Sequence, residues 1–415
     1  MEIFFVNKNE FFYLLKLRQI YDTIIKKEGV MGVPIFLYNE SKKPNSAYRM
    51  EIYNGMTREF AKRRIKYFFI SSPEELKEYL KKYNESNSSL VLFPTSEKMR
   101  RHMFDIFSEI NIYKIVFAKQ DVHTATSDFS SVTCNFQEDM KLAVAHLKER
   151  GCKKIALFNA NSNGNHDKAR IESYIQHIYH DPLIFYADKT IYHVLLKLLD
   201  CEEQIDAIIC NNDYTAFHLM LFLSTINKNW NDKLLVLSFA DTALSSLCSP
   251  SLSSVSLNNV NAGKEIATIH SFIKKSNHVA HMHVVMKNHL FARETTQKND
   301  PEGIIFSKQK RFTEEELAKI TASSRKCMSL EKLLISCSST DLKIIHCLVL
   351  SKTINEMQSI LYLSCESIKY HIKKYKAALG FSTTKELSEW LQQWIDPFKL
   401  EEALRNNKTF KNNRY

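Results

Sequence analysis

Residues 67–93, YFFISSPEELKEYLKKYNESNSSLVLF, contain two short apolar runs on either side of a charged stretch. The apolar runs have the length and character of β-strands. In the charged stretch, Ser72 can cap a helix, Pro73 suits its first turn, and Glu74 lies near the positive end of the helix dipole. The segment is therefore typical of a strand, a helix and a second strand in succession.

The same alternation extends from Met31 to about residue 297. Further strand-like runs occupy residues 33–38, 113–118, 153–158, 206–211 and 233–239, and charged helical stretches occupy residues 51–65 and 96–110. Strands that alternate with helices form parallel sheets whose two faces are covered by helices. The pattern predicts an α/β fold for this region.

The chain on either side of this region has a different pattern. Residues 1–30 carry apolar side chains at intervals of three and four, which predicts an amphipathic helix that packs on its own protein or mediates dimerisation. Residues 298–335 begin as a polar linker and continue as a helix, and residues 336–395 are helical with short breaks. Residues 396–415 are polar and are expected to form a frayed tail. The sequence thus predicts a small all-α domain after the α/β region.

The composition restricts the classes of function. The 415 residues carry a net charge of +11, which is compatible with a polyanionic partner. No apolar run approaches the roughly 20 residues of a membrane helix, and the N-terminus lacks the features of a secretory signal, so we expect a cytoplasmic protein with no membrane partner. The sequence also lacks the phosphate-binding and nucleophile motifs of common enzymes. We expect neither a cofactor nor enzymatic activity.

Neither cysteine nor histidine spacing predicts a metal site. The nine cysteines occur singly, without the close pairs of a zinc knuckle or a disulfide framework. Four histidines lie near one another, at positions 278, 281, 283 and 289. No matching pattern of carboxylates or cysteines accompanies them, so we expect an ordinary strand there and no metal.

Residues 340–395 divide into four helical pieces. Thr353 can cap the second piece and Ser364 the third, and only residues 362–364 separate the two. Two short helices joined by such a turn are typical of a helix-turn-helix, whose second helix can lie in the major groove of DNA.

The third piece has two distinct faces. Its buried stripe is expected at Ile368, Ile372, Tyr375 and Leu379, which repeat at intervals of four, three and four. Its exposed face is expected at Lys369, Lys373 and Lys376, with Tyr370 and Lys374 at the edges. Such a lysine face can neutralise phosphates, and an ordinary solvated helix face is the alternative.

These helices resemble the LuxR-type helix-turn-helix of bacterial transcription regulators. The resemblance rests on Asp341, on TINEM at 353–357, on SIKYHI at 367–372 and on LGFST at 379–383. Ser339, Ser351 and Gln358 depart from the family pattern, which usually has proline, glycine and alanine there. The resemblance implies that double-stranded DNA is bound by Ser364, Ser367, Lys369, Tyr370, Lys373, Lys374 and Lys376. The alternative is an adaptor whose C-terminal helices bind a protein.

Residues 31–296 resemble the ligand-binding core of LacI/GalR repressors and of type I periplasmic sugar-binding proteins. The similar segments are SSVTCNFQEDMKLAVAHLKERGCKKIALF at 130–158, AIICNNDYTA at 207–216, VLSFADTALSSLCSPSLSSV at 236–255 and FARET at 291–295. The resemblance implies two doubly wound lobes joined by three crossings, with a ligand in the cleft between them. Residues 31–132 and about 256–281 would form one lobe, and the other residues up to about 293 would form the second.

The same resemblance implies a set of ligand-binding residues, namely Tyr48, Arg170, Asn212, Asp213 and Asp241. A guanidinium, carboxylates and an aromatic ring suit a polyol such as a sugar. Asp213 can alternatively serve as a helix cap, and Asp241 can hold a turn. Ser238, Ala240 and Leu257 depart from the family pattern, so the pocket can hold a different ligand or none. The expected protein is a homodimeric regulator whose DNA binding responds to a small molecule.

Overall fold

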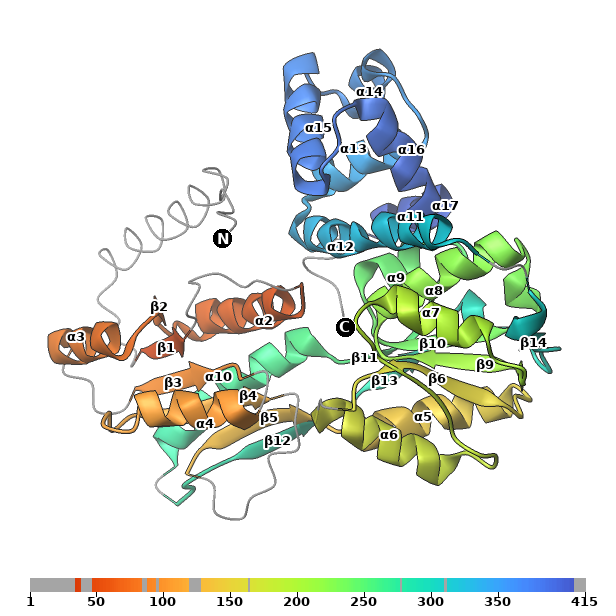
Figure 1. Ribbon diagram of the computed structural model, residues 1–415. Coiled ribbons are helices and arrows are strands. Elements are labelled where there is room, and N and C mark those ends of the chain that lie inside the picture. The colour runs from red at the N-terminus through yellow and green to blue at the C-terminus, as the bar shows by residue number, and fades with distance from the viewer. Residues whose placement is uncertain are drawn as a thin grey trace.

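The computed structural model describes residues 34–38, 47–83, 88–94, 97–118, 128–162, 165–276, 278–309 and 312–406. They form two α/β lobes with mainly parallel sheets, followed by an all-helical region (Figure 1). The predicted fold class is confirmed. The helix expected within residues 1–30 lies outside the described residues. In the part of the chain that the structure covers, no helix is both long and apolar enough to cross a membrane.

The sheet of the first lobe has the strand order β12-β5-β4-β3-β1-β2. Its strands are β1 (Ile35–Tyr38), β2 (Tyr67–Ile70), β3 (Ser89–Leu92), β4 (Tyr113–Ala118), β5 (Ser130–Cys134) and β12 (His283–Met286), and each neighbouring pair is parallel. Its helices are α2 (Ala47–Arg63), α3 (Pro73–Tyr83), α4 (Glu97–Ile106) and α10 (Asn259–Lys275). The segment 67–93 forms β2, α3 and β3 as predicted, and the Glu75 backbone N–H donates to Ser72 Oγ at 3.2 Å. The two strands flank β1 instead of pairing with each other.

The boundary expected for the first lobe near residue 281 is wrong, because β12 lies beyond it. The pairing of Val284 with Val132 adds β12 to the edge of this sheet next to β5. The chain therefore leaves the first lobe for the last time after Met286.

Helices α2 and α10 of the first lobe touch at backbone distance. A Cβ atom at Gly55 would lie 2.0 Å from the carbonyl oxygen of Val260, and one at Gly263 would lie 2.2 Å from that of Ile52. Only glycine permits this approach without a shift of one helix. Helix α2 is thereby seated against α10, which begins just after the chain returns from the second lobe.

The second lobe has the strand order β13-β11-β10-β9-β6-β7. Its strands are β6 (Ile155–Ala160), β7 (Leu183–Tyr186), β9 (Ala207–Cys210), β10 (Leu235–Ala240), β11 (Ser253–Ser256) and β13 (His289–Phe291), of which β13 alone runs antiparallel to its neighbour. Its helices are α5 (Phe136–Glu149), α6 (Asn165–His177), α7 (Ile191–Leu199), α8 (Asp213–Ile226) and α9 (Ala243–Leu247), with 3₁₀ turns η1 (Trp230–Asp232), η2 (Glu294–Thr296) and η3 (Phe306–Lys308). A separate antiparallel pair joins β8 (Gln204–Ile205) and β14 (Ile304–Ile305).

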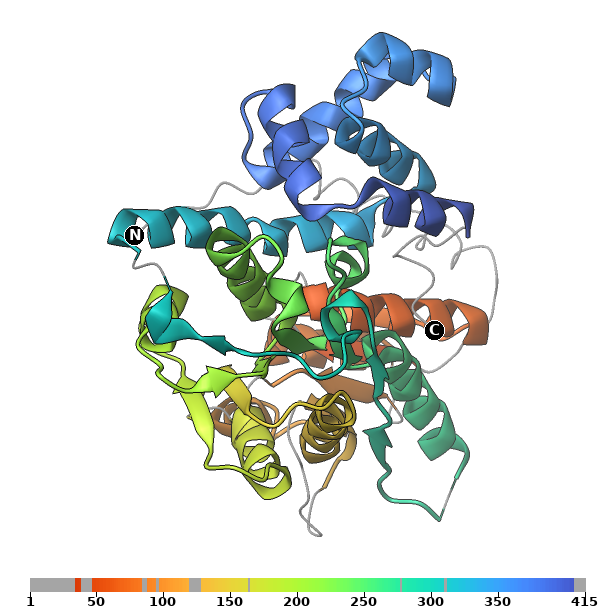
Figure 2. The same ribbon diagram turned by 90° about the vertical axis from the view of Figure 1, so that its right-hand side faces the viewer.

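The all-helical region packs directly on the second lobe. It consists of α11 (Glu314–Arg325), α12 (Cys327–Ser336), α13 (Ser339–Val349), α14 (Ile354–Leu361), α15 (Cys365–Leu379), α16 (Thr384–Trp394) and α17 (Pro397–Arg405). One continuous cluster of buried side chains includes Phe217 and Leu244 of the lobe and Leu330 and Trp394 of the helices. The rings of Phe217 and Trp394 meet edge to face with centroids 5.9 Å apart. In Figure 2 the blue helices lie above the green second lobe.

The expectation of a frayed tail is wrong for residues 397–405, which form α17. Asp396 caps this helix through its side chain, which accepts from the backbone N–H groups of Phe398 and Lys399. Pro397 occupies the first turn, and Leu400 is fully buried. A side-chain cap, a proline in the first turn and the burial of Leu400 and Ala403 stabilise a helix in a segment that is polar on average.

Candidate functional site

The lobes are joined at three crossings, and a cluster of charged and aromatic side chains lies where the first and third crossings meet. The first crossing runs from β5 into α5, the second from β11 into α10, and the third from β12 into β13. Asp139 of α5 and Asn288 of the third crossing are both buried, and Asn288 Nδ2 donates to both Asp139 carboxylate oxygens at 2.9 Å. This contact ties the two crossings together.

Arg170 of α6 lies beside this pair and is 5% exposed. Its guanidinium carbon is 4.0 Å from the ring centroid of Phe239 and 4.9 Å from that of Phe136, distances at which a cation is attracted by both rings. Its Nη1 atom donates to the backbone oxygen and the side-chain oxygen of Asn211, at 3.0 and 3.2 Å. Its Nε atom has no hydrogen-bond partner among the described residues. Arg170, predicted from the sequence, therefore lies at the junction of the lobes with its buried Nε donor unsatisfied.

The carboxyl group of Asp139 has an unusual pKa. Burial raises the pKa to about 6, against the opposing effects of the Arg170 charge and the Asn288 hydrogen bonds. Sequence reasoning missed Asp139 and Asn288, because Asp139 lies on the buried face of a helix and Asn288 reaches it only through the third crossing. A carboxylate on a helix face that is otherwise apolar, between Phe136 and Ala143, was the one available signal.

Asp213 is fully buried and joins several elements of the second lobe. Its carboxylate accepts hydrogen bonds from the hydroxyls of Ser238, Ser245 and Ser254 at 2.5–2.7 Å and from the backbone N–H of Thr242 at 2.6 Å. Both oxygens are used inside the lobe, where they hold α8 to β10, β11 and α9. The neighbouring Asn212 caps α8 by accepting from the Thr215 N–H at 3.0 Å. In this structure both residues serve the lobe itself.

Asp241 lies at the carboxyl end of β10 in a strained backbone conformation. Its φ is 50°, and that of the preceding Ala240 is 130°, values that side-chain-bearing residues rarely adopt. The carboxylate of Asp241 pairs with Arg293 Nη2 at 2.5 Å, and Arg293 Nη1 donates to the Leu252 carbonyl oxygen at 2.7 Å. Asp241 therefore links the end of β10 to the end of β13.

The fifth predicted residue, Tyr48, lies in the first turn of α2, and its side chain is outside the described residues. The structure thus brings Arg170, Asp139 and Asn288 together and adds Phe136 and Phe239 to them. Within the described ranges, no group of histidine, cysteine, aspartate and glutamate side chains could hold a metal ion.

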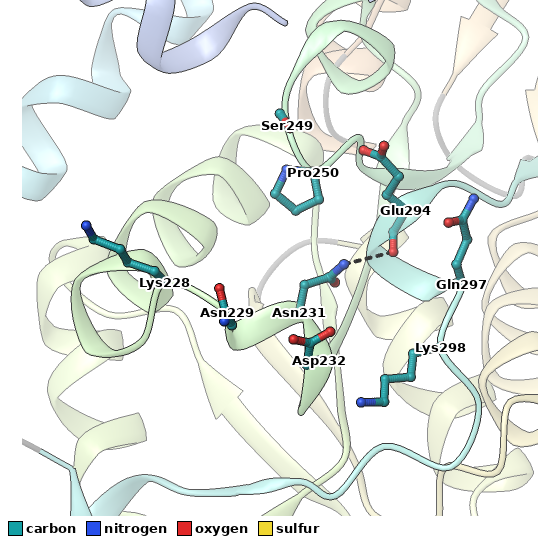
Figure 3. A pocket seen from close by; sticks show the side chains of 9 residues that line it. All are labelled: Lys228, Asn229, Asn231, Asp232, Ser249, Pro250, Glu294, Gln297 and Lys298. Atoms are coloured by element: carbon teal, nitrogen blue, oxygen red, sulfur yellow. Dashed lines mark hydrogen bonds between the residues drawn. The ribbon is translucent and has the colours of Figure 1, made fainter.

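A surface depression on the second lobe lies outside this cluster. It is lined by Lys228, Asn229, Asn231, Asp232, Ser249, Pro250, Glu294, Gln297 and Lys298 (Figure 3). Asn231 Nδ2 donates to the Glu294 backbone oxygen at 3.0 Å, which joins η1 to η2 among the lining residues. None of the predicted ligand-binding residues lines it.

Helices α14 and α15 have the expected caps, and α15 has the expected buried stripe. Thr353 and Ser364 cap the two helices through their side chains, and Tyr362 ends α14 in the left-handed conformation with φ 54°. The stripe predicted to be buried is buried throughout. Lys369, Lys373 and Lys374 are exposed, as is Tyr370 at 62%.

Two residues of the predicted lysine face also contact the protein. Lys376 is half-buried, and its Nζ donates to the Ser382 carbonyl oxygen at 3.0 Å, which helps to hold the start of α16. Lys374 Nζ lies 3.6 Å from the Asp341 carboxylate. The face with the fewest internal contacts is therefore formed by Lys369, Tyr370 and Lys373.

Asp341 of α13 fixes the orientation of α15. Its Oδ1 accepts from His371 Nδ1 and from the Tyr375 hydroxyl, both at 2.8 Å, and its Oδ2 accepts from Ser338. Burial alone would raise the pKa of this carboxyl, but the hydrogen bonds from Ser338, Tyr375 and His371 outweigh it and hold the pKa well below its usual range. The same carboxylate raises the pKa of Tyr375, whose burial contributes most.

Comparison with known proteins agrees with the architecture of the lobes. The periplasmic binding protein-like domain family matches residues 144–296. The solved structure of transcriptional regulator LacI from Bacillus cereus subsp. cytotoxis NVH 391-98 superposes with a TM-score of 0.50 at 14% identity, covering 65% of this chain and 100% of that one. The two lobes have a periplasmic-binding-protein-like fold. No curated protein matches the chain.

Two further structures similar to these periplasmic-binding-protein-like lobes were solved with sugars. The regulator CelR in complex with cellobiose has a TM-score of 0.49 at 17% identity and covers 67% of this chain and 90% of its own. A LacI-family regulator from Enterococcus faecalis V583 with bound ribose has a TM-score of 0.49 at 14% identity and covers 63% of this chain and 98% of its own. The family match ends at residue 296, before the helical region begins.

Proposed function

We propose that the chain is a ligand-responsive DNA-binding transcriptional regulator. A small molecule bound between the lobes modulates DNA binding by the helix-turn-helix formed by α14 and α15. The observation that carries this proposal is the exposed face of α15, where Lys369, Tyr370 and Lys373 project from a helix whose opposite side is fully buried.

The chemistry of this face suits a nucleic acid. Lys369 and Lys373 are one helical turn apart, so both ammonium groups can reach phosphates on one strand. The helix contains one acid, Glu366, which lies in its first turn. Tyr370, between the lysines, can contact base edges or sugars. Ser364 and Ser367 at the start of the helix lie where a phosphate can approach backbone N–H groups.

The division of labour follows the domain organisation. Residues 31–297 form the effector-binding region, residues 298–335 the connecting segment, and residues 336–395 the DNA-binding domain. In the effector-binding region, the cluster around Arg170 brings together a guanidinium and the Asp139 carboxylate, the kinds of group that hydrogen-bond a polyol. The regulators solved with cellobiose and ribose support a sugar as the first class of effector to examine. A homodimer would present two such helices to two half-sites.

Selection of bound sequences from a random DNA library by the full-length protein tests the proposal. Enrichment of one sequence motif is expected, with tighter binding to that motif than to scrambled DNA in a gel shift. Lys369→Gln should weaken binding, whereas Lys385→Gln, the same change at an 86% exposed side chain on α16, should not. Absence of any enriched motif would contradict DNA binding and favour the adaptor that binds a protein through these helices.

A further inference from the structure

Helix α12 lies where the two lobes and the helical region meet. It contacts α2 of the first lobe, α8 and α9 of the second lobe, and α15. Figure 1 shows it below α15 and above the lobes. A helix that touches both lobes is affected by any change in their relative position, and contact with α15 passes that change to the helix with the lysine face.

A buried carboxylate anchors α12 to the second lobe. Glu331, in the middle of α12, is 1% exposed. Its Oε1 accepts from the Ala243 backbone N–H at 2.8 Å, and its Oε2 accepts from the Leu244 N–H at 3.0 Å. These are N–H groups in the first turn of α9, where no residue earlier in the same helix can accept them. Glu331 thus supplies from another helix the cap that the Thr242 side chain does not provide.

The start of α9 is also joined to the region of the predicted cleft residues. Asp213 accepts from the Thr242 N–H and from the Ser245 hydroxyl, both at 2.6 Å. Asp241, with its strained backbone, immediately precedes Thr242. The buried carboxylates of Asp213, from the second lobe, and of Glu331, from α12, therefore both hold the first turn of α9.

The other end of α9 is tied to α17. The Leu247 carbonyl oxygen accepts from the Asp396 N–H at 2.7 Å, and Lys399 Nζ donates to the Cys248 carbonyl oxygen at 2.8 Å. Lys399 also pairs with Glu294 at 2.5 Å. Glu294 follows Arg293, the partner of Asp241, in the chain. The start of α9 is thus tied to α12, and its end is tied to α17. Through both contacts, α9 connects the carboxyl end of β10 to the helical region.

We propose that α12 is the transmission helix of this protein, with Glu331 as the positioning residue that couples it to α9. This inference rests on the proposed function and specifies how the effector signal reaches α15. When the lobes change their relative position, Glu331 keeps α12 attached to α9 while the contact of α12 with α2 changes. Helix α12 then shifts relative to α2, and α15, which contacts α12, moves with it. An effector that favours one lobe arrangement thereby selects one placement of the lysine face.

Hydrogen–deuterium exchange of the full-length protein tests the coupling without any DNA or effector. In Glu331→Gln, one carboxylate oxygen is replaced by an amide that cannot accept the N–H, so exchange should rise roughly tenfold at residues 243–248. If α12 transmits, exchange should also rise at residues 365–379, by about twofold or more. Glu315→Gln on α11 is the matched control, because its side chain is 79% exposed, and it should change neither segment.

A second perturbation enters from the first lobe. Gly55→Ala must displace α2 from α10, because the added Cβ would lie 2.0 Å from the Val260 carbonyl oxygen. Exchange should change in α12 and α15 as well as in α2 and α10. If Glu331→Gln does not fold, Glu331→Asp can replace it, because aspartate retains the charge on a shorter side chain. This variant should also raise exchange at residues 243–248 and 365–379.

Two results would overturn the proposal. One is faster hydrogen–deuterium exchange at residues 243–248 in the Glu331 variants with unchanged exchange at residues 365–379. That result would show that Glu331 only caps α9. The other is an effect of Gly55→Ala confined to α2 and α10. Because neither measurement involves DNA, the coupling can fail while DNA binding holds, and DNA binding can fail while the coupling holds.

Discussion

His371 Nδ1 lies 2.8 Å from the Oδ1 atom of Asp341, so that a carboxylate on α13 holds the centre of α15. The Tyr375 hydroxyl, one turn further along α15, donates to the same oxygen atom. The lysine face of α15 is therefore oriented by a buried polar contact on its opposite side as well as by apolar packing.

Asp341→Asn should lower the free energy of unfolding at neutral pH by roughly 2–3 kcal/mol, because several hydrogen bonds to a charged acceptor are weakened. The pKa of the carboxyl is lower in the folded protein than its ordinary value of 3.8, so its stabilisation is complete above about pH 4 and is lost as the pH falls further. Thermal unfolding of the two proteins at pH 7 and at progressively lower pH checks this. A gap in Tm that stays constant as the pH falls below 4 would contradict the role of the ionised carboxylate.

Asp139 should give the opposite pH dependence. Its pKa is raised to about 6 from 3.8, so the folded protein loses stability as the pH rises from about 4 to 6, by at most roughly 3 kcal/mol. Asp139→Asn removes the titrating group, and its stability should be flatter across this interval. The difference in Tm between variant and wild type, measured from pH 4 to 7, is the readout. Parallel profiles for the two proteins would exclude Asp139 as the source.

Lys373→Gln should weaken binding to every DNA sequence and reduce the slope of log affinity against log salt by about 0.9. Tyr370→Ala should change which bases are preferred, with a smaller effect on the salt slope. Fluorescence anisotropy at several salt concentrations, on the selected site and on single-base variants, separates the two effects. An equal loss of binding affinity at all DNA sequences for both variants would show that Tyr370 does not contact bases specifically.

Arg170→Lys should abolish the stabilisation by effector while leaving DNA binding of the effector-free protein intact. Lysine keeps the charge but cannot reproduce the guanidinium contacts with Asn211 and the two aromatic rings. Under the proposed function, sugars are the first class of compounds to test by thermal shift, since an effector at 100 times its Kd adds about 2.7 kcal/mol. An unchanged shift in the variant would place the effector elsewhere.

Asp213→Asn should destabilise the second lobe whether or not an effector is present. An amide has one acceptor oxygen where the carboxylate now accepts four hydrogen bonds, so a loss of about 3 kcal/mol or more is expected. Chemical denaturation without any added compound measures it. A variant of normal stability that fails to respond to effector would instead support the predicted ligand-binding role of Asp213.

Periodicity predicted the α/β fold and the helices α14 and α15 well because local signals determine them. Ser72, Thr353 and Ser364 cap the helices that the sequence indicated, and the buried stripe of α15 follows directly from its spacing. The sequence predicted less well which strands lie next to each other in a sheet, because the position of β12 depends on pairing with a strand about 150 residues earlier in the chain.

The candidate site was predicted in part, for a related reason. Arg170 was found through a family resemblance, but its partners Phe239 and Asn211 come from other strand ends. The hydrogen bonds that Ser238 and Ser254 donate to Asp213 have no sequence signature. Serines are common, and only the fold brings these two next to the carboxylate. Likewise, nothing near Glu331 in the sequence indicates that it caps a helix nearly 90 residues upstream.

The continuous apolar core shared by the second lobe and the helical region has a practical consequence for protein engineering. Cutting the chain before α11 would strip cover from Phe217 and Leu244 and leave the partner faces of Leu330 and Trp394 open to water. Grafting these helices onto a foreign receptor would therefore require transplanting the α8–α9 surface with them. The all-helical region and the second lobe would thus have to be moved as one unit, because they share one buried core.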